Sequence, residues 1–185
     1  MTDDVLKDAE VHMQKALDAL QRELVTIRTG RATPALVERV TVEYYGVATP
    51  INQVATITAP EPRLLQISPW ERNMIGPIEK AILKADLGFN PNNDGRVIRI
   101  AVPALTEQRR RDFVKLIKQH VEEARVAIRN IRRHTLHDLQ ELENEKLIAE
   151  DEHKRATEKV QTVVDRYIHE AEQMGDAKEA EVMEV

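Results

Sequence analysis

Arginine and lysine side chains recur along residues 106–133 at spacings that place them on one edge of a helix. The members of this row are Arg111, Lys115, Lys118, Arg125, Arg129 and Arg132, and Glu122 is the one acid that interrupts it. Guanidinium groups are planar and weakly hydrated, so a cluster of them suits phosphate oxygens better than it suits other cations. The pattern therefore predicts binding of a phosphate backbone.

A solvated helix face is the ordinary explanation of a charged row. Such a face usually carries Glu four residues from Arg or Lys, where the two charges support each other, but no acid lies between Arg125 and Arg133. No aromatic residue interleaves with the row, which argues against stacking of single-stranded bases and favours backbone contacts with folded RNA or DNA. The predicted RNA-binding residues are Arg28, Arg31, Arg110, Arg125, Arg129, Arg132 and Arg133.

The charge distribution supports this prediction, although the whole chain of 185 residues carries a net charge of −5. Residues 106–137 contain nine basic and four acidic residues, a net charge of +5, whereas residues 138–185 contain six and fifteen, a net charge of −9. An RNA partner would attract the first segment and repel the second, which would orient the molecule on it.

Catalytic motifs are absent from the sequence. No phosphate-binding GxxxxGK[ST] loop, GxSxG elbow or HExxH pair occurs, and there is no Cys. His134 and His137, with Asp138, could hold a metal, but histidines on a polar helix face are more often solvated. We expect no catalytic residue, no metal and no cofactor. A helical adaptor that binds protein and no RNA, and a metal-dependent hydrolase at these histidines, remain as alternatives.

The element that positions the arginines is a long helix. Residues 104–174 contain neither Gly nor Pro, and Thr106 is a suitable N-cap for a helix that continues to about Lys146, roughly 60 Å at 1.5 Å per residue. Apolar residues recur along it at steps of three and four. They are Phe113, Ile117, Val121, Ala124, Ile128 and Ile131.

Two further helices carry a similar apolar stripe, one over residues 3–28 that stops at Gly30, and one from Glu150 that stops at Gly175 and leaves a frayed tail. None of the three can bury its stripe alone, so they should pack together as a bundle. The segment between them alternates short strands (40–45, 54–58, 64–67 and 96–102) with one helix (71–87).

The predicted fold class is therefore α+β, an elongated antiparallel three-helix bundle with an inserted small α/β domain. The bundle is discontinuous, residues 1–30 plus 105–185, and the insert spans residues 31–104. Two short connections, at 29–31 and 102–106, would form a hinge whose residues are Gly30, Pro103, Ala104, Leu105 and Thr106. The longest uncharged run, residues 44–60, is short for a membrane span, so we expect a soluble cytoplasmic protein.

Several motifs resemble those of the bacterial ribosome recycling factor family. They are RTGRATP at 28–34, VEYYG at 42–46, ADLGFNPNNDG at 85–95, PALTEQRRRDFVK at 103–115, ARVAIRNIRRH at 124–134 and KEAEVMEV at 178–185. Their order and spacing match over the whole chain. His134 stands where the family usually has an acid, and the segment 138–145 is acidic here where many members are rich in lysine.

The resemblance implies an L-shaped, monomeric translation factor that is not an enzyme. It would act after termination with elongation factor G, which uses GTP, and would split the spent ribosome into subunits. It implies that the bundle lies on large-subunit ribosomal RNA, with the family's RNA-contacting arginines falling on Arg28, Arg31, Arg129 and Arg132. The insert and hinge would take the push from elongation factor G.

Overall fold

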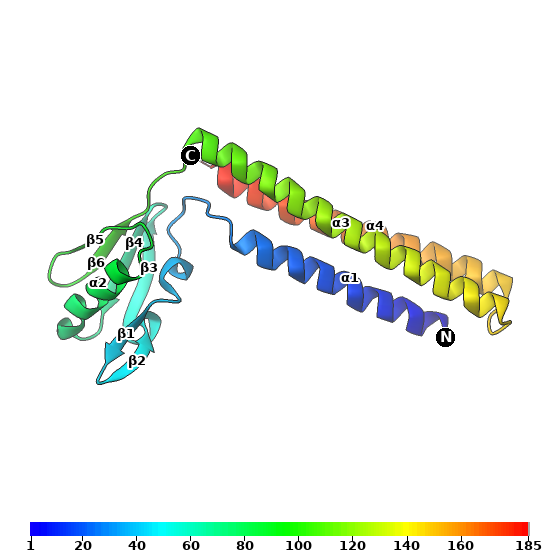
Figure 1. Ribbon diagram of the computed structural model, residues 1–185, viewed down its shortest axis with the longest axis horizontal. Coiled ribbons are helices and arrows are strands. Elements are labelled where there is room, and N and C mark those ends of the chain that lie inside the picture. The colour runs from blue at the N-terminus through cyan, green and yellow to red at the C-terminus, as the bar shows by residue number, and fades with distance from the viewer. Residues whose placement is uncertain (185) are drawn as a thin grey trace. The chain divides into compact units, whose positions relative to one another are not determined.

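The structure is a computed structural model in which residues 1–184 are described. It divides into two compact units (Figure 1): residues Met1–Arg28 with Thr106–Glu184, here called the helical unit, and residues Thr29–Leu105, here called the mixed unit. Long helices form the first unit, and short strands with one α-helix form the second. The predicted α+β class is confirmed.

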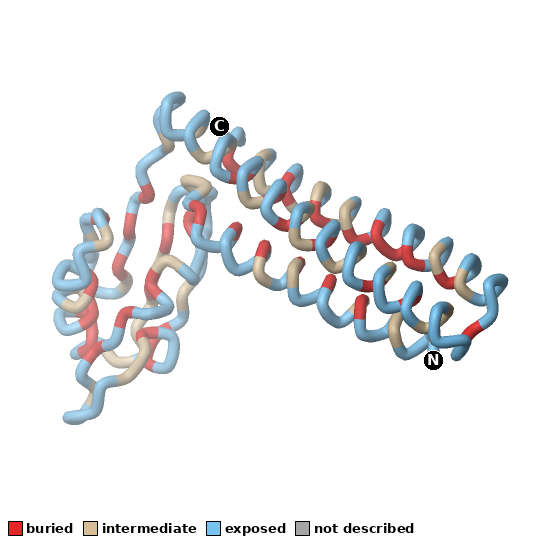
Figure 2. Tube along the Cα trace, turned by 45° about the vertical axis from the view of Figure 1, so that its right-hand side comes forward, coloured by how far each residue is buried: buried red, intermediate tan, exposed pale blue. Residues whose placement is uncertain are grey.

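The helical unit contains α1 (Thr2–Val25), α3 (Glu107–Asn144) and α4 (Glu150–Met183). In Figure 1, α3 runs antiparallel to both α1 and α4. Each helix contacts the other two, and each turns its buried residues inward (Figure 2). The buried positions include Met13 and Leu17 of α1, Ile117, Ile128 and Leu139 of α3, and Val160, Val164 and Ala171 of α4.

The long helix α3 begins where the sequence predicts. The hydroxyl of Thr106 accepts a hydrogen bond from the backbone N–H of Arg109 at 3.2 Å, which satisfies one of the free donors of the first turn. Four of the six residues in its predicted apolar stripe are buried, and Phe113 and Ile131 are half-buried. At the other end, Lys146 adopts φ 60° and the chain reverses into α4.

The predicted stop of the last helix at Gly175 is wrong, because α4 continues to Met183. Gly175 is buried against α3, where a Cβ atom would lie 2.5 Å from Cγ2 of Val121. The residues that follow are mostly good helix formers, and Val182 is only 1% exposed. Gly175 therefore allows two helices to approach closely; it does not end one. Val185, the last residue of the predicted tail, lies outside the described residues.

The mixed unit is built on a four-stranded antiparallel sheet of order β3-β4-β6-β5. Its strands are β3 (Ala55–Glu61), β4 (Leu64–Pro69), β5 (Pro91–Asn93) and β6 (Ile98–Ala101). Alternate residues of β4 and β6 are buried, so one face of the sheet belongs to the core. The helix α2 (Ile75–Lys84) contributes Ile78 and Ile82 to the same core.

A separate hairpin joins β1 (Thr41–Tyr44) to β2 (Val47–Pro50) through Tyr45 and Gly46, which both have positive φ. The sequence analysis predicts neither β2 nor β5. Strand β2 has no buried residue and therefore no alternation, and β5 consists of Pro-Asn-Asn, residue types that strands avoid. Three 3-10 turns, Pro34–Val37, Ile51–Gln53 and Arg72–Met74, complete the unit, and the last delays the start of the predicted 71–87 helix to Ile75.

Candidate nucleic-acid interface

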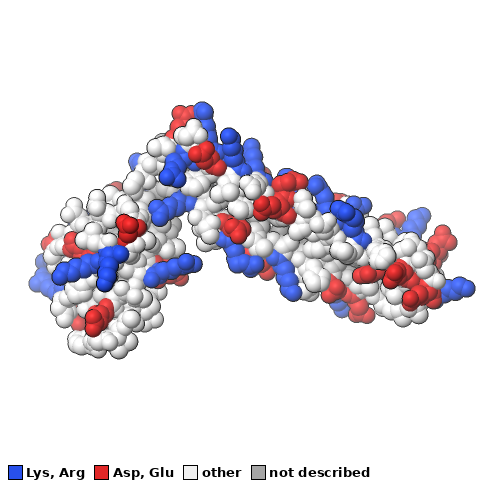
Figure 3. Space-filling view, viewed as in Figure 1, with Lys and Arg blue, Asp and Glu red and all other residues white. Residues whose placement is uncertain are grey.

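Helix α3 carries five of the seven predicted RNA-binding arginines, and Arg28 follows α1 in the same unit. Arg31 belongs to the mixed unit. Arg28, Arg31, Arg129 and Arg133 are exposed, whereas Arg110, Arg125 and Arg132 are half-buried. Figure 3 shows basic side chains gathered along the edge that α3 forms, with acidic side chains between them.

The row occupies the side of α3 that faces α4. Arg125 forms ion pairs with Glu172 of α4 at 3.1 Å, whereas His120, on the other flank of α3, lies 3.8 Å from Glu23 of α1. At about 100° per residue, Arg129 and Arg132 share the flank of Arg125. The three neighbouring arginines therefore lie along one border of the bundle.

Arg125 is held by two carboxylates of its own chain. Its Nη1 donates to Glu122 Oε2 at 2.9 Å and its Nε donates to Glu172 Oε1 at 3.1 Å, and the side chain is 29% exposed. The hydrogen bond with Glu122, with Glu172 adding to it, raises the pKa of Arg125. Arg125 thus links α3 to α4, a role that sequence reasoning missed because Glu172 is 47 residues away along the chain.

Arg129 has a weaker internal partner. Its Nη1 lies 3.5 Å from Glu122 Oε1, beyond ordinary hydrogen-bond length for charged groups, and its side chain is 53% exposed. One carboxylate therefore serves two guanidinium groups, tightly at Arg125 and loosely at Arg129.

Arg132 and Arg133 make no ion pair within residues 1–184, and the same holds for the side chain of Arg110. In addition, the Nε atoms of Arg110 and Arg132 are buried without an acceptor in the described part of the chain. A guanidinium group has five N–H donors, and buried donors in proteins are usually satisfied. These side chains retain accessible N–H groups that could donate hydrogen bonds to a phosphate.

The histidines of the metal alternative do not gather ligands. His137 pairs with Glu141 at 3.3 Å on the exposed side of α3, and His134 is exposed next to it. Among residues 1–184, no group of three or more His, Cys, Asp or Glu side chains is arranged to hold a metal ion. In the same part of the chain, no helix has the length and apolar character needed to cross a membrane.

The predicted hinge residues lie where the chain enters and leaves the mixed unit. Gly30 has φ 75°, and a Cβ atom on it would lie 3.4 Å from Cγ of Leu105. Just inside the unit, the N–H of Ala32 donates to Pro62 O at 2.7 Å and the N–H of Val102 donates to Arg63 O at 2.8 Å. Both segments are thus held by the same β3–β4 turn.

Comparisons with known proteins point to one family. The family model described as "Ribosome recycling factor" matches residues 20–183. The chain is 56% identical to the ribosome-recycling factor of Roseiflexus sp. (strain RS-1) and 54% identical to that of Carboxydothermus hydrogenoformans, in each case over 100% of both chains.

Two solved structures are also similar. One is the solution structure of a ribosome recycling factor, with a TM-score of 0.76 and 45% identity over 100% of this chain and 98% of that one. The other comes from models for the T. thermophilus ribosome recycling factor and the E. coli elongation factor G bound to the E. coli post-termination complex. It has a TM-score of 0.65 and 46% identity, and 100% of both chains is covered.

Proposed function

This chain belongs to the ribosome recycling factor family, a family of translation factors that are not enzymes, and from that premise we propose how it acts. The helical unit binds large-subunit ribosomal RNA through the arginines of α3. With elongation factor G and GTP, the bound factor then separates the post-termination ribosome into subunits, acting in the cytoplasm as a monomer. Its work is mechanical: it binds and transmits force, and elongation factor G hydrolyses the GTP.

The observation that carries the RNA-binding proposal is the set of guanidinium groups with unused donors. Arg132 and Arg133 have no carboxylate partner in the described residues, and Arg110 and Arg132 each bury an Nε atom without an acceptor. These residues lie in segment 106–137, of net charge +5, whereas segment 138–185 has a net charge of −9. Phosphate oxygens can accept from the accessible N–H groups of these side chains, whereas the two buried Nε atoms lie out of their reach.

The members of the predicted arginine set have different roles in this proposal. Arg132 and Arg133, with Arg110 and the exposed Arg28, Arg31 and Arg129, contact phosphates. Arg125 would have to leave both Glu122 and Glu172 to do the same, so we assign it the link between α3 and α4.

The proposed partners come from the T. thermophilus relative, which is 46% identical and is placed with elongation factor G on a post-termination complex. The two segments at 29–31 and 102–106 form the hinge through which elongation factor G would move the mixed unit while the helical unit stays on the RNA. Gly30 supports this assignment because its φ of 75° is one that other residues adopt only with strain.

The test is a measurement of binding to large ribosomal subunits over a range of salt concentrations. If four or five phosphates are contacted, log affinity falls with log salt at a slope of roughly −3 to −5. Arg132→Gln and Arg133→Gln each weaken binding and reduce the slope by about 1. Arg155→Gln, an exposed arginine of α4 outside the set, is the matched control and leaves both quantities unchanged.

The adaptor alternative gives the opposite result. A helical bundle that binds another protein and no RNA would keep its affinity after Arg132→Gln and would not show the salt slope expected for phosphate contacts. Circular dichroism of each variant confirms that the helices are intact, so a loss of binding reports on the contact and not on the fold.

A further inference from the structure

Glu122 is the one acid inside the arginine row, and its carboxylate lies between two members of it. We propose that Glu122 is an internal competitor of the RNA: its carboxylate pairs with Arg129 in the free protein, and Arg129 leaves this pair when a phosphate binds to it. Glu122 thereby lowers the affinity of the factor for ribosomal RNA and speeds its release. This inference rests on the RNA-binding function proposed above.

The two oxygens of the Glu122 carboxylate have different partners. Oε2 accepts a hydrogen bond from Arg125 at 2.9 Å, while Oε1 lies 3.5 Å from Nη1 of Arg129. Because Arg125 is also bonded to Glu172 and is less than one-third exposed, it holds Glu122 in position. The carboxylate is therefore fixed beside Arg129 without being tightly bound to it.

A phosphate can readily replace Glu122 as the partner of Arg129. The pair between Arg129 and Glu122 is long and more than half exposed on both sides, and such surface pairs contribute little. A phosphate offers shorter, bidentate hydrogen bonds to the same guanidinium group. Arg129 can thus change partner while Arg125 keeps both of its carboxylates and continues to link α3 to α4.

Release of the factor is where this competition matters. When a phosphate leaves Arg129, the carboxylate is already in place to take the vacated guanidinium group. Glu122 also repels the departing phosphate. Removing its charge should tighten binding by about two- to fivefold, the factor expected for the loss of one exposed ion pair, mainly through slower dissociation.

Glu122→Gln is the sharpest variant, because the amide oxygen can still accept the hydrogen bond from Arg125 while the negative charge is lost. Glu122→Ala, which suits a helix, is the second variant and removes both acceptors. The matched control is Glu123→Gln. Glu123 lies on a different side of α3, where it contacts His120 at 3.4 Å and Gln119 at 3.2 Å, and its loss changes the net charge by the same amount.

The experiment measures the affinity and dissociation rate for large ribosomal subunits, with each variant made in the original chain and in an Arg129→Gln background. We expect both Glu122 variants to bind about two- to fivefold more tightly than the original chain, and Glu123→Gln to bind as the original chain does. The gain should vanish in the Arg129→Gln background, because the guanidinium group that Glu122 occupies is then absent.

Three results would overturn the inference: equal gains from Glu122→Gln and Glu123→Gln, a gain that persists without Arg129, or weaker binding after either Glu122 substitution. The proposed function fails in a different way. In that case Arg132→Gln has no effect and the affinity of the original chain does not respond to salt. Thermal unfolding of each variant shows whether a change in binding comes with a change in fold.

Discussion

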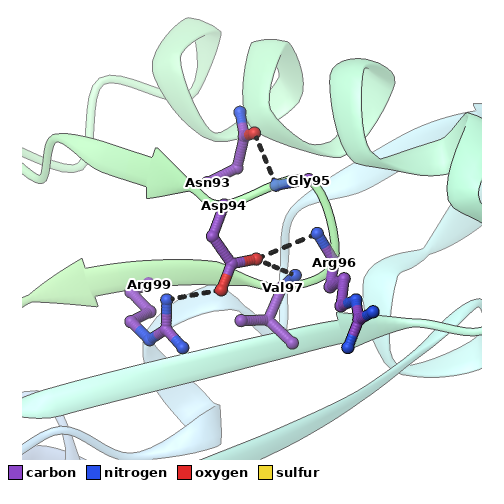
Figure 4. Close-up of polar contacts among 6 residues, drawn as sticks. All are labelled: Asn93, Asp94, Gly95, Arg96, Val97 and Arg99. Carbon is purple, nitrogen blue, oxygen red and sulfur yellow. Dashed lines mark hydrogen bonds and ion pairs between the residues drawn. The ribbon is translucent and has the colours of Figure 1, made fainter.

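Asp94 fixes a loop of the mixed unit with a single side chain (Figure 4). Its Oδ1 accepts the backbone N–H groups of Arg96 and Val97, both at 2.9 Å, and its Oδ2 accepts from Nη1 of Arg99 at 2.8 Å. The backbone hydrogen bonds from Val97 and Arg96, followed by the one from Arg99, hold the pKa of Asp94 far below its usual range. The ionised carboxylate therefore stabilises the folded loop.

This arrangement predicts the pH dependence of the mixed unit. Because the pKa of Asp94 is lower in the folded chain than in the unfolded one, its contribution is fully present above about pH 4, the unfolded pKa, and is lost as the pH falls below that value. The difference in unfolding free energy between the original chain and Asp94→Asn should be constant from about pH 8 to 5 and should shrink towards about pH 2. Urea denaturation followed by the fluorescence of Trp70, the single tryptophan, measures it.

The control is Glu61→Gln, which removes an exposed carboxylate of the same unit for which the structure shows no side-chain partner in the described residues. Because the structure shows no such partner for Glu61, this substitution should change the unfolding free energy less than Asp94→Asn does at neutral pH. If the difference in unfolding free energy between the original chain and Asp94→Asn stayed constant down to about pH 2, the carboxylate charge would not stabilise the loop.

At the scale of elements, the packing of α4 on α3 depends on the absence of a side chain at Gly175. A Cβ atom there would meet Cγ2 of Val121 at 2.5 Å, and a valine in a helix has little freedom to rotate away. The helix tolerates the glycine because residues on both sides of it are packed: Ala171, one turn before, and Val182, two turns after, are both buried. Close helix approach outweighs the cost of glycine in a helix interior.

Gly175→Ala should therefore destabilise the protein, although alanine is the better helix former. Overpacking costs about 1–3 kcal/mol, and the gain in helix propensity returns about 1 kcal/mol, so the net loss should be up to about 2 kcal/mol. Thermal unfolding followed by circular dichroism measures it. Adding Val121→Ala to Gly175→Ala should reduce the loss by making room for the new methyl group.

Ala177→Gly supplies the comparison for helix propensity alone, because Ala177 is an exposed residue of the same helix, two positions after Gly175. It should cost about 1 kcal/mol. If Gly175→Ala raised the stability of the chain, the close approach of α3 and α4 would not constrain this position.

At the scale of the whole molecule, two segments of chain connect the two units, and the boundaries between the units fall at residues 28/29 and 105/106. Gly30 and Leu105 lie next to each other there, in the mixed unit. Under the proposed mechanism these segments transmit force from the mixed unit to the helical unit. Binding and force transmission should therefore be separable by mutation.

Gly30→Ala tests that separation. Its new Cβ would be strained by the positive φ and would lie 3.4 Å from Leu105, while the α3 arginines are untouched. Affinity for large subunits should fall less than it does after Arg132→Gln, because only the neighbouring Arg31 and Arg28 of the proposed phosphate contacts could shift. Subunit splitting with elongation factor G and GTP, followed by light scattering, should slow by up to about tenfold, the factor for roughly 1.4 kcal/mol.

Gly88→Ala is the control for backbone strain alone, since Gly88 has φ 78° and a Cβ atom added to it would meet nothing within 4 Å. It should split subunits faster than Gly30→Ala does. Equal rates for the two variants would show that position 30 has no special role in transmission.

The local features of this protein can be read from its sequence alone. Apolar residues at steps of three and four predict the three long helices, Thr106 predicts the start of α3, and the basic row predicts which helix edge is cationic. Each of these signals comes from residues within a few turns of one another, because helices are made of short-range hydrogen bonds.

Only the folded structure shows which arginine is already paired with a carboxylate and which glycine is packed against another helix. Glu172 reaches Arg125, and Val121 reaches Gly175, from helices that are distant in sequence. A residue pattern cannot distinguish a glycine that ends a helix from one that lets a second helix approach, or a guanidinium group that awaits a phosphate from one that holds a carboxylate. That choice depends on the side chain on the facing helix, which long-range packing alone brings there.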